Sequence, residues 1–319
     1  LAMLWQTTMH QRADLASANE QVGTYSRLAQ KESERAEATI DLFLKSLDRQ
    51  YYSAVRRSFQ ENQSPITTPR SDLEFTKESE HQLMEGLRLT QELVSSLGNR
   101  PERLIQIART TRRAGFVLAN HHRDDQARRQ FEFAERTLSS LDTRDPIVAL
   151  ERCWLAYNVA KLERRTDGFQ TASKRYREVH DLAAPILHAP DTPASVRSRI
   201  HEVAGFASLS LHQFNDAAQH LEAVTESECE PASILLAKIA AYRMSGRHQF
   251  ALPLAEQAVG QLPDDSDAWR NLAGLRLHLG RNETARKAFR QAIILDPYNG
   301  LAWQGLAWAD FQCNDLSAA

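Results

Sequence analysis

The 319-residue sequence has few of the residues that interrupt helices, with only 12 glycines and 11 prolines. This scarcity argues against a fold rich in turns and favours long helices. Neither sign of charge dominates, because 39 Lys and Arg accompany 41 Asp and Glu, so nothing indicates a nucleic-acid or membrane-surface binder. There is no run of 18 or more apolar residues, and hence no complete membrane span within the sequence.

Residues that carry chemistry are equally sparse. Cys153, Cys229 and Cys313 are too few and too far apart for a disulfide framework or a zinc site, so we expect buried or half-buried thiols. The triplet His122-Arg123-Asp124 matches the start of a protein-kinase catalytic loop, but Arg129 stands where that loop needs a metal-binding Asn. We therefore expect no catalytic residue, no metal ligand and no cofactor, and we predict that this chain is not an enzyme.

The N-terminal third is predicted to contain two helical segments and a linker. Apolar residues recur every three or four positions from Leu15 to Tyr51, which predicts a long helix over 1–60 of coiled-coil or juxtamembrane type. Two prolines in a polar stretch then predict a linker over 61–72. A further helix is expected within 73–100, where Gly98 and Pro101 favour its end.

A period of 34 residues follows and is clearest near the C-terminus. The unit beginning at Ser266 has large residues at positions 4 and 24 and small ones at positions 8, 20 and 27. These residues are Trp269, Phe289, Ala273, Ala285 and Ala292. The unit beginning at Ala232 repeats the pattern, and one beginning at Gly300 follows it as far as Ala319. We therefore assign 232–319 to clear repeats, with the last one truncated.

Weaker copies of the pattern lie upstream, over 101–231, in registers that begin at Ala108, Cys153 and Ser198. They are predicted to be degenerate repeats with longer turns between them. The unit that begins at Gly300 stops where its second helix would start. Because a first helix alone leaves an apolar face uncovered, we expect the natural protein to continue past Ala319.

The 34-residue pattern resembles the tetratricopeptide repeat, whose unit is a pair of packed antiparallel helices. The resemblance implies an all-α fold, with a long N-terminal helix followed by an α-α superhelix, and a protein-binding function. In this family, positions 2, 5, 9, 12 and 13 of the first helix line the concave face. The candidate partner-binding residues are therefore Arg243, Met244, Arg270, Leu277, His278, Gln304, Trp308 and Phe311. This mixture suits an extended peptide or helix with some acidic character.

The order of segments also resembles the region that follows the membrane helix in bacterial eukaryotic-like Ser/Thr protein kinases. An Arg-Ala-Glu-Ala-Asn signature is typical of that region, and Arg35-Ala36-Glu37-Ala38-Thr39 stands in its place here. Thr39 replaces the expected Asn and Phe43 an expected Ala, which leaves a short motif of modest specificity. The resemblance implies a kinase domain upstream of this chain and a membrane anchor before Leu1.

Two settings for the chain therefore remain open. It is either the extracytoplasmic part of a single-pass bacterial membrane kinase or a free-standing cytoplasmic adaptor with no kinase attached. In both settings the expected partner is a protein or peptide in the concave groove, and no nucleic acid. Self-association is expected through the helix over residues 10–60 or through the truncated C-terminal edge.

Overall fold

The computed structural model describes residues 43–51, 77–96, 101–227, 229 and 231–313. The chain divides into two compact units, Leu1–Leu47 and Asp48–Ala319. Every regular element in the described ranges is a helix, so the predicted all-α class is confirmed. Residues 43–51 are helical. The linker over 61–72, the Arg35–Thr39 motif and Ala319 lie outside these ranges, and the proposed domain boundaries stay predictions.

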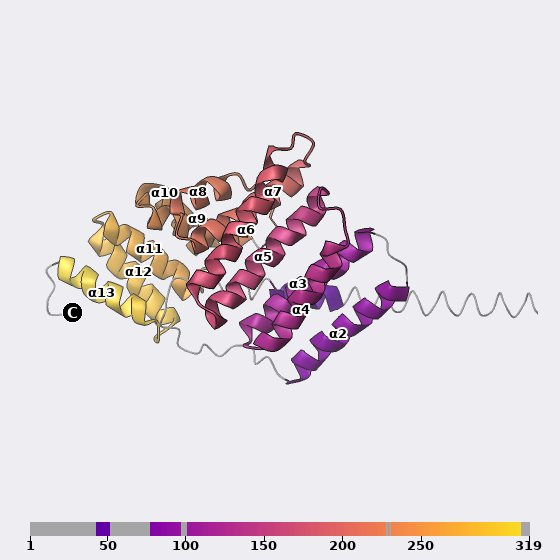
Figure 1. Ribbon diagram of the computed structural model, residues 1–319. Coiled ribbons are helices and arrows are strands. Elements are labelled where there is room, and N and C mark those ends of the chain that lie inside the picture. Colours follow the sequence, from indigo (N-terminus) through magenta and orange to yellow (C-terminus); the bar gives the residue numbers. More distant parts are fainter. Residues whose placement is uncertain (1–42, 52–76, 97–100, 228, 230, 314–319) are drawn as a thin grey trace, which may run out of the picture. The chain divides into compact units, whose positions relative to one another are not determined.

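The second unit is a succession of helices joined mostly by short turns (Figure 1). None of the helices in the described ranges is long and apolar enough to cross a bilayer. Their bounds are α2 (Lys77–Ser96), α3 (Pro101–Asn120), α4 (Asp124–Ser139), α5 (Pro146–Thr166), α6 (Phe169–His188), α7 (Ala194–Ser210), α8 (Phe214–Glu222), α9 (Pro231–Met244), α10 (His248–Gln261), α11 (Ser266–His278), α12 (Asn282–Leu295) and α13 (Gly300–Gln312).

These helices pack in consecutive pairs. Helix α3 packs on α4, α5 on α6, α7 on α8, α9 on α10 and α11 on α12. Most first helices of neighbouring pairs also meet, since α3 contacts α5, α5 contacts α7, α7 contacts α9 and α11 contacts α13. Contacts of this kind join each pair mainly to its neighbours along the chain, as in other helical repeat proteins.

Short polar side chains start several of the first helices. The Asp145 carboxylate accepts a hydrogen bond from the Ile147 amide at 2.8 Å, and Pro146 occupies the first helical position of α5. Asp265 accepts from the amides of Asp267 and Ala268 at 2.9 and 3.0 Å at the start of α11. These side chains satisfy amides that have no partner within the helix and so fix where each helix begins.

One turn position recurs with a left-handed backbone. His122, His212, Gly246 and Gly280 have φ angles of 57°, 61°, 76° and 72°. Each residue is number 15 of its unit, counted from Ala108, Ser198, Ala232 and Ser266. Glycine adopts this conformation without steric cost, whereas histidine does not. The degenerate units that begin at Ala108 and Ser198 therefore keep the turn geometry of the clear units without its favoured residue, glycine.

Small residues at position 8 allow close helix crossings. A Cβ atom added to Gly115 would lie 2.7 Å from Cε1 of Phe131, and one added to Gly205 would lie 2.7 Å from Cγ of Leu221. Both partners occupy position 24 of the same unit, on the second helix. The sequence pattern of small and large positions thus corresponds to direct contact between the two helices of a pair.

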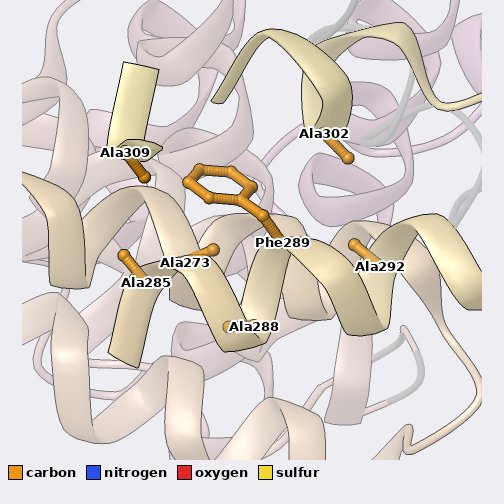
Figure 2. Close-up of a cluster of buried hydrophobic side chains, with 7 residues drawn as sticks. All are labelled: Ala273, Ala285, Ala288, Phe289, Ala292, Ala302 and Ala309. Atoms are coloured by element: carbon orange, nitrogen blue, oxygen red, sulfur yellow. The ribbon is translucent and has the colours of Figure 1, made fainter. Parts of the chain in front are cut away.

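Alanines and one phenylalanine form the core between α11, α12 and α13 (Figure 2). The ring of Phe289 reaches from α12 toward α13, where Ala302 and Ala309 are fully buried. Trp269, Leu277, Ile293 and Leu306 pack around this cluster and are partly buried. The side chains facing Phe289 are short, so the three helices can approach one another closely.

A tryptophan hydrogen bond repeats at two unit boundaries. The Trp269 indole donates to the Pro263 carbonyl at 2.8 Å, and the Trp303 indole donates to the Pro297 carbonyl at 2.8 Å. The two bonds are 34 residues apart, and each joins position 4 of one unit to position 32 of the unit before it. This bond therefore defines how consecutive C-terminal units are joined.

A buried carboxylate links α5 to α3. Glu151 is fully buried and accepts from Nε of Arg109 at 2.6 Å and from Nη2 of Arg112 at 3.1 Å. Arg112 is only 1% exposed, and its guanidinium lies 5.4 Å from the ring centroid of Trp154. Charges removed from water to this extent are tolerated only when they are paired, so this cluster fixes the relative position of α3 and α5.

Candidate protein-binding surface

Helices α5, α7 and α9 form a hollow of about 100 Å³ on the side of the array made by the first helices. We call it the Arg243 hollow. On α7 and α9 its lining residues are numbers 9, 12 and 13 of their units, which explains why they point to the same side. The lining residues are Tyr157, Arg164, Phe206, Leu209, Ser210, His212, Phe214, Ala240, Arg243 and Met244.

The Arg243 hollow combines cations with apolar surface. Arg164 and Arg243 lie among aromatic and aliphatic side chains, and none of the residues lining this hollow is acidic. Met244 is 49% exposed at the rim. Burial, followed by the charge of Arg270, lowers the pKa of the Arg243 guanidinium. The hollow therefore presents positive charge that is only partly hydrated, which favours a negatively charged group beside an apolar one.

Two guanidinium nitrogens in this region have no hydrogen-bond acceptor among the described residues. They are Nε of Arg243 and Nη2 of Arg270. Arg270 is 9% exposed and its Nε contacts the Asp267 carboxylate at 3.2 Å, so only part of its hydrogen-bonding capacity is used. Buried donors without acceptors are costly, and an incoming carboxylate would satisfy them.

A second hollow, of about 300 Å³, lies between α3 and α5. We call it the Lys161 hollow. Its lining residues are Phe116, Ala119, Asn120, Lys161, Leu162, Arg164 and Arg165. Arg164 lines both hollows, so the two adjoin on α5. Arg165 donates to the Ala119 carbonyl at 2.6 Å and pairs with Asp124.

The eight residues predicted from the sequence lie in different surroundings. Arg243 and Met244 line the Arg243 hollow, and Arg270 lies beside it. Leu277 packs against the alanine-rich core. The ring of His278 stacks on that of His248, with centroids 4.6 Å apart. Gln304, Trp308 and Phe311 are exposed on α13, and the rings of the last two are 5.6 Å apart. The structure thus places two of the eight in one hollow, and their binding role stays a prediction.

Most of the residues that line the two hollows are not among the eight predicted from the sequence. Arg164, Lys161 and Phe206 occupy groove positions of the degenerate units that begin at Cys153 and Ser198. Applying positions 9, 12 and 13 to those units would have identified them. The eight predicted residues all belong to the clear repeats, whereas these three belong to degenerate units whose sequences carry the same position pattern.

In the unit that begins at Gly300, position 4 is Trp303, and its side chain is 51% exposed. Its counterpart Trp269 packs against the cluster of α11, α12 and α13. The reason is local, because nothing in the described part of the chain packs on the outer face of α13. Position 4 is therefore buried only where the next helix covers it.

Motifs that suggested chemistry have structural roles. In the triplet 122–124, Arg123 pairs with Glu80 at 2.8 Å and Asp124 pairs with Arg165. Cys153 and Cys229 are buried and Cys313 is partly buried, as predicted for free thiols. Burial raises the pKa of the Cys153 thiol to about 12, which makes it unreactive. Within the described ranges, no group of three or more His, Cys, Asp or Glu is placed to hold a metal ion.

Comparison with known proteins gives one family match. Residues 236–300 match the family model of the tetratricopeptide repeat. No curated protein matches the chain. Among solved structures, the chain is similar to a mutant form of MamA, with 22% identity and a TM-score of 0.39 over 59% of this chain and 97% of that one.

Two further structures are similar at lower identity. A tetratricopeptide repeat protein from Parabacteroides merdae ATCC 43184 shares 12% identity with a TM-score of 0.44, over 84% of this chain and 88% of that one. The apo form of RapI also shares 12% identity with a TM-score of 0.44, over 84% and 99%. Because these scores are below 0.5, the fold assignment depends on the helix pairs and the family match. The chain is therefore a helical repeat protein whose residues 236–300 match the tetratricopeptide repeat model.

Proposed function

We propose that this chain is a non-catalytic scaffold that binds an extended protein segment containing acidic and apolar residues. The observation that carries the proposal is the Arg243 hollow, where Arg164 and Arg243 lie beside Phe206 and Met244. Three first helices contribute to it, so a segment bound there would run across several units. Surfaces of this kind suit an extended chain better than a small compact ligand.

The basic residues and the apolar residues of the lining would have separate functions. The arginines would pair with a carboxylate of the segment, and such charge-assisted hydrogen bonds are stronger than neutral ones. Phe206, Phe214 and Met244 would cover an apolar side chain next to it, and methionine adapts to varied shapes. The two together would select segments in which an acidic residue accompanies an apolar one.

Selection of 12-residue peptides displayed on phage tests this proposal. We expect peptides recovered with the full chain to be enriched in Asp or Glu together with Leu, Phe or Met. Arg243→Gln should weaken binding of a selected peptide by roughly tenfold, which corresponds to the loss of one charge-assisted hydrogen bond. The measurement is fluorescence anisotropy with the labelled peptide.

The matched control is Arg290→Gln, because Arg290 is an exposed arginine of α12 that does not line the hollow. Circular dichroism of both variants would show whether the fold is retained. Selected peptides without acidic residues, or equal losses in the two variants, would contradict the proposal.

A narrower proposal is that the scaffold forms the C-terminal region of a membrane-anchored Ser/Thr kinase. Its support is the Arg35–Thr39 motif and the order of segments in the sequence. The sequence of the gene upstream of Leu1 tests it directly. Kinase motifs followed by a membrane span would support it, whereas their absence would favour a free-standing adaptor.

A further inference from the structure

We propose that the rings of Phe169, His212 and Phe214 form a site for an aromatic side chain, which is carried by the segment bound in the Arg243 hollow. We call these three residues the aromatic shelf. The inference rests on the proposed function and deepens it, because it names the apolar residue that accompanies the acidic one. The family match covers only residues 236–300, so the likeness to tetratricopeptide repeats assigns no role to the aromatic shelf.

The three rings contact one another at the turns of two consecutive units. The ring centroid of His212 lies 5.8 Å from that of Phe169 and 5.7 Å from that of Phe214. The interplanar angles are 41° and 71°, so neither phenylalanine ring lies flat on the imidazole. Phe169 is 39% exposed, and His212 is exposed as well. Aromatic rings prefer offset or edge-to-face contacts at these distances, so a further ring could join the aromatic shelf in the same way.

The backbone of His212 is the second argument. Its φ angle of 61° belongs to the left-handed region, which histidine enters only at a steric cost. In the two clear units that follow, glycine stands at this position. The turn itself is closed by the backbone, because the His212 amide donates to the Leu209 carbonyl at 3.1 Å and the Gln213 amide donates to the Ser208 carbonyl at 2.9 Å. Backbone strain that the turn does not require is typical of positions where the side chain serves binding.

The two phenylalanines occupy the same position of consecutive units. Phe169 is residue 17 of the unit that begins at Cys153, and Phe214 is residue 17 of the unit that begins at Ser198. The repeat pattern assigns no large residue to this position, and the next two units have a histidine and an asparagine there. The packing pattern of the units therefore does not account for this pair of exposed or half-buried rings.

The aromatic shelf adjoins the Arg243 hollow. His212 and Phe214 belong to the lining of this hollow, as does Arg164, whose Cζ lies 5.7 Å from the ring centroid of Phe169. An acidic residue paired with the arginines would place the neighbouring side chain of the segment beside the three rings. Contacts between aromatic rings gain from the charge distribution of the rings as well as from burial. The aromatic shelf should therefore prefer a phenyl ring to a saturated ring of the same size.

Fluorescence anisotropy with three fluorescein-labelled peptides tests the inference on the full chain. Each probe has three glutamates on either side of one central residue, which is phenylalanine, cyclohexylalanine or glycine. Phenylalanine and cyclohexylalanine have nearly the same size, and the saturated ring is at least as apolar. We expect the phenylalanine probe to bind about three- to tenfold more tightly than the cyclohexylalanine probe.

Two variants separate binding from folding. His212→Gly removes the ring and relieves the backbone, so it should abolish the preference for phenylalanine without lowering the urea midpoint of unfolding. Phe169→Leu keeps an apolar side chain outside the hollow and should also reduce the preference. The matched control is His122→Gly, because His122 has a φ of 57° in the equivalent turn and lines neither hollow. It should leave the preference unchanged.

The inference is overturned if the phenylalanine probe fails to bind, or if it binds no more tightly than the cyclohexylalanine probe. It is also overturned if the preference persists in His212→Gly or is lost equally in His122→Gly. Arg243→Gln tests the proposed function separately, since it should weaken all three probes alike through their glutamates. If it does so while no preference for phenylalanine is seen, the proposed function stands and only the aromatic shelf is refuted.

Discussion

Gly205 has no room for a methyl group, although it lies within a helix where alanine would otherwise be preferred. Its added Cβ would lie 2.7 Å from Cγ of Leu221. We expect Gly205→Ala to destabilise the fold by about 1–3 kcal/mol, the usual cost of overpacking. Gly260 of α10 has open space around its Cα, so Gly260→Ala should instead stabilise by about 0.5–1 kcal/mol.

Urea unfolding followed by circular dichroism measures both changes. The pair is matched, since each substitution adds one methyl group to a helical glycine with ordinary φ. Shifts of the same sign and size in the two variants would show that the crossing at Gly205 is looser than the structure indicates.

Three histidines meet between α6, α7 and α8. Nδ1 of His201 lies 3.0 Å from Nδ1 of His220, and the ring centroid of His180 is 5.8 Å from that of His220. Burial, followed by the neighbouring histidines, lowers the pKa of His220 to about 4. Burial also lowers the pKa of His201, with Arg197 adding to the shift, and that of His180, which Asp216 and Asp181 partly offset.

The sign of the pH dependence follows from these shifts. The folded state favours neutral rings, so their contribution is complete above the ordinary pKa of 6.5 and is lost as pH falls from there toward 4. Protonation would also place two donors face to face at the His201–His220 contact. We expect the chain to be less stable at pH 5 than at pH 7.5, by about 1 kcal/mol for His220 after allowance for its partial exposure.

Urea unfolding at pH 7.5 and pH 5 measures this difference, and His220→Gln should reduce it. His188→Gln is a suitable control, because His188 is an exposed histidine of α6 whose ring contacts the Ala184 carbonyl of the same helix. An equal pH dependence in the wild type and in His220→Gln would mean that other groups are responsible.

At the scale of helices, the Glu151 cluster links α5 to α3 through two arginines. Removal of its carboxylate would take from Arg112, which is 1% exposed, the charged acceptor of two of its hydrogen bonds. We expect Glu151→Gln to destabilise the fold by about 3 kcal/mol or more. Asp142→Asn breaks an exposed ion pair with Arg144 and should leave the melting temperature unchanged.

Thermal unfolding monitored at 222 nm compares these two substitutions. Both replace a carboxylate by its amide, so the chemical change is the same and only the surroundings differ. A small effect of Glu151→Gln would indicate that water reaches the Arg112 guanidinium in solution.

The sequence predicted some helix pairs more accurately than others. The pairs α9–α10 and α11–α12 follow directly from a 34-residue pattern, because small residues such as Ala285 can only mark close crossings. The unit of α5 and α6 was harder to place, since its best register begins at Cys153, seven residues inside the helix that starts at Pro146. There the apolar pattern surrounds the whole helix, and periodicity no longer singles out one face.

The site was predictable only in part for a related physical reason. Position numbers specify the side to which a side chain points, and Arg243 and Met244 were found in this way. Whether the residue at such a position lines a hollow depends on side chains from neighbouring helices. The sequence of one unit does not contain those side chains. Leu277 illustrates the difference, because it packs into the core instead of lining either hollow.

Across the whole second unit, each helix pair depends mainly on its neighbours. Ala285 is fully buried in the core of α11, α12 and α13. We expect Ala285→Trp to increase amide hydrogen exchange in α11–α13 while leaving α3–α6 protected, since damage in repeat arrays stays local. Lys287→Ala, on the exposed side of α12, should change neither region.

Hydrogen exchange measured by mass spectrometry distinguishes these outcomes by peptide. Increased exchange throughout α3–α13 in Ala285→Trp would mean that the array unfolds as one cooperative body. Equal exchange in Ala285→Trp and Lys287→Ala would refute the assignment of position 20 to the helix crossing.

The indole-to-carbonyl hydrogen bonds of Trp269 and Trp303 give two consecutive unit boundaries the same contact. If residues 266–299 were duplicated in tandem, the tryptophan of the inserted copy would again stand six residues after a proline whose carbonyl can accept a hydrogen bond from its indole. The new junction would reproduce a bond already present twice, and no contact of a new kind would have to form. Gene duplication could then lengthen the face made by the first helices by one unit at a time, with the same bond at each new boundary.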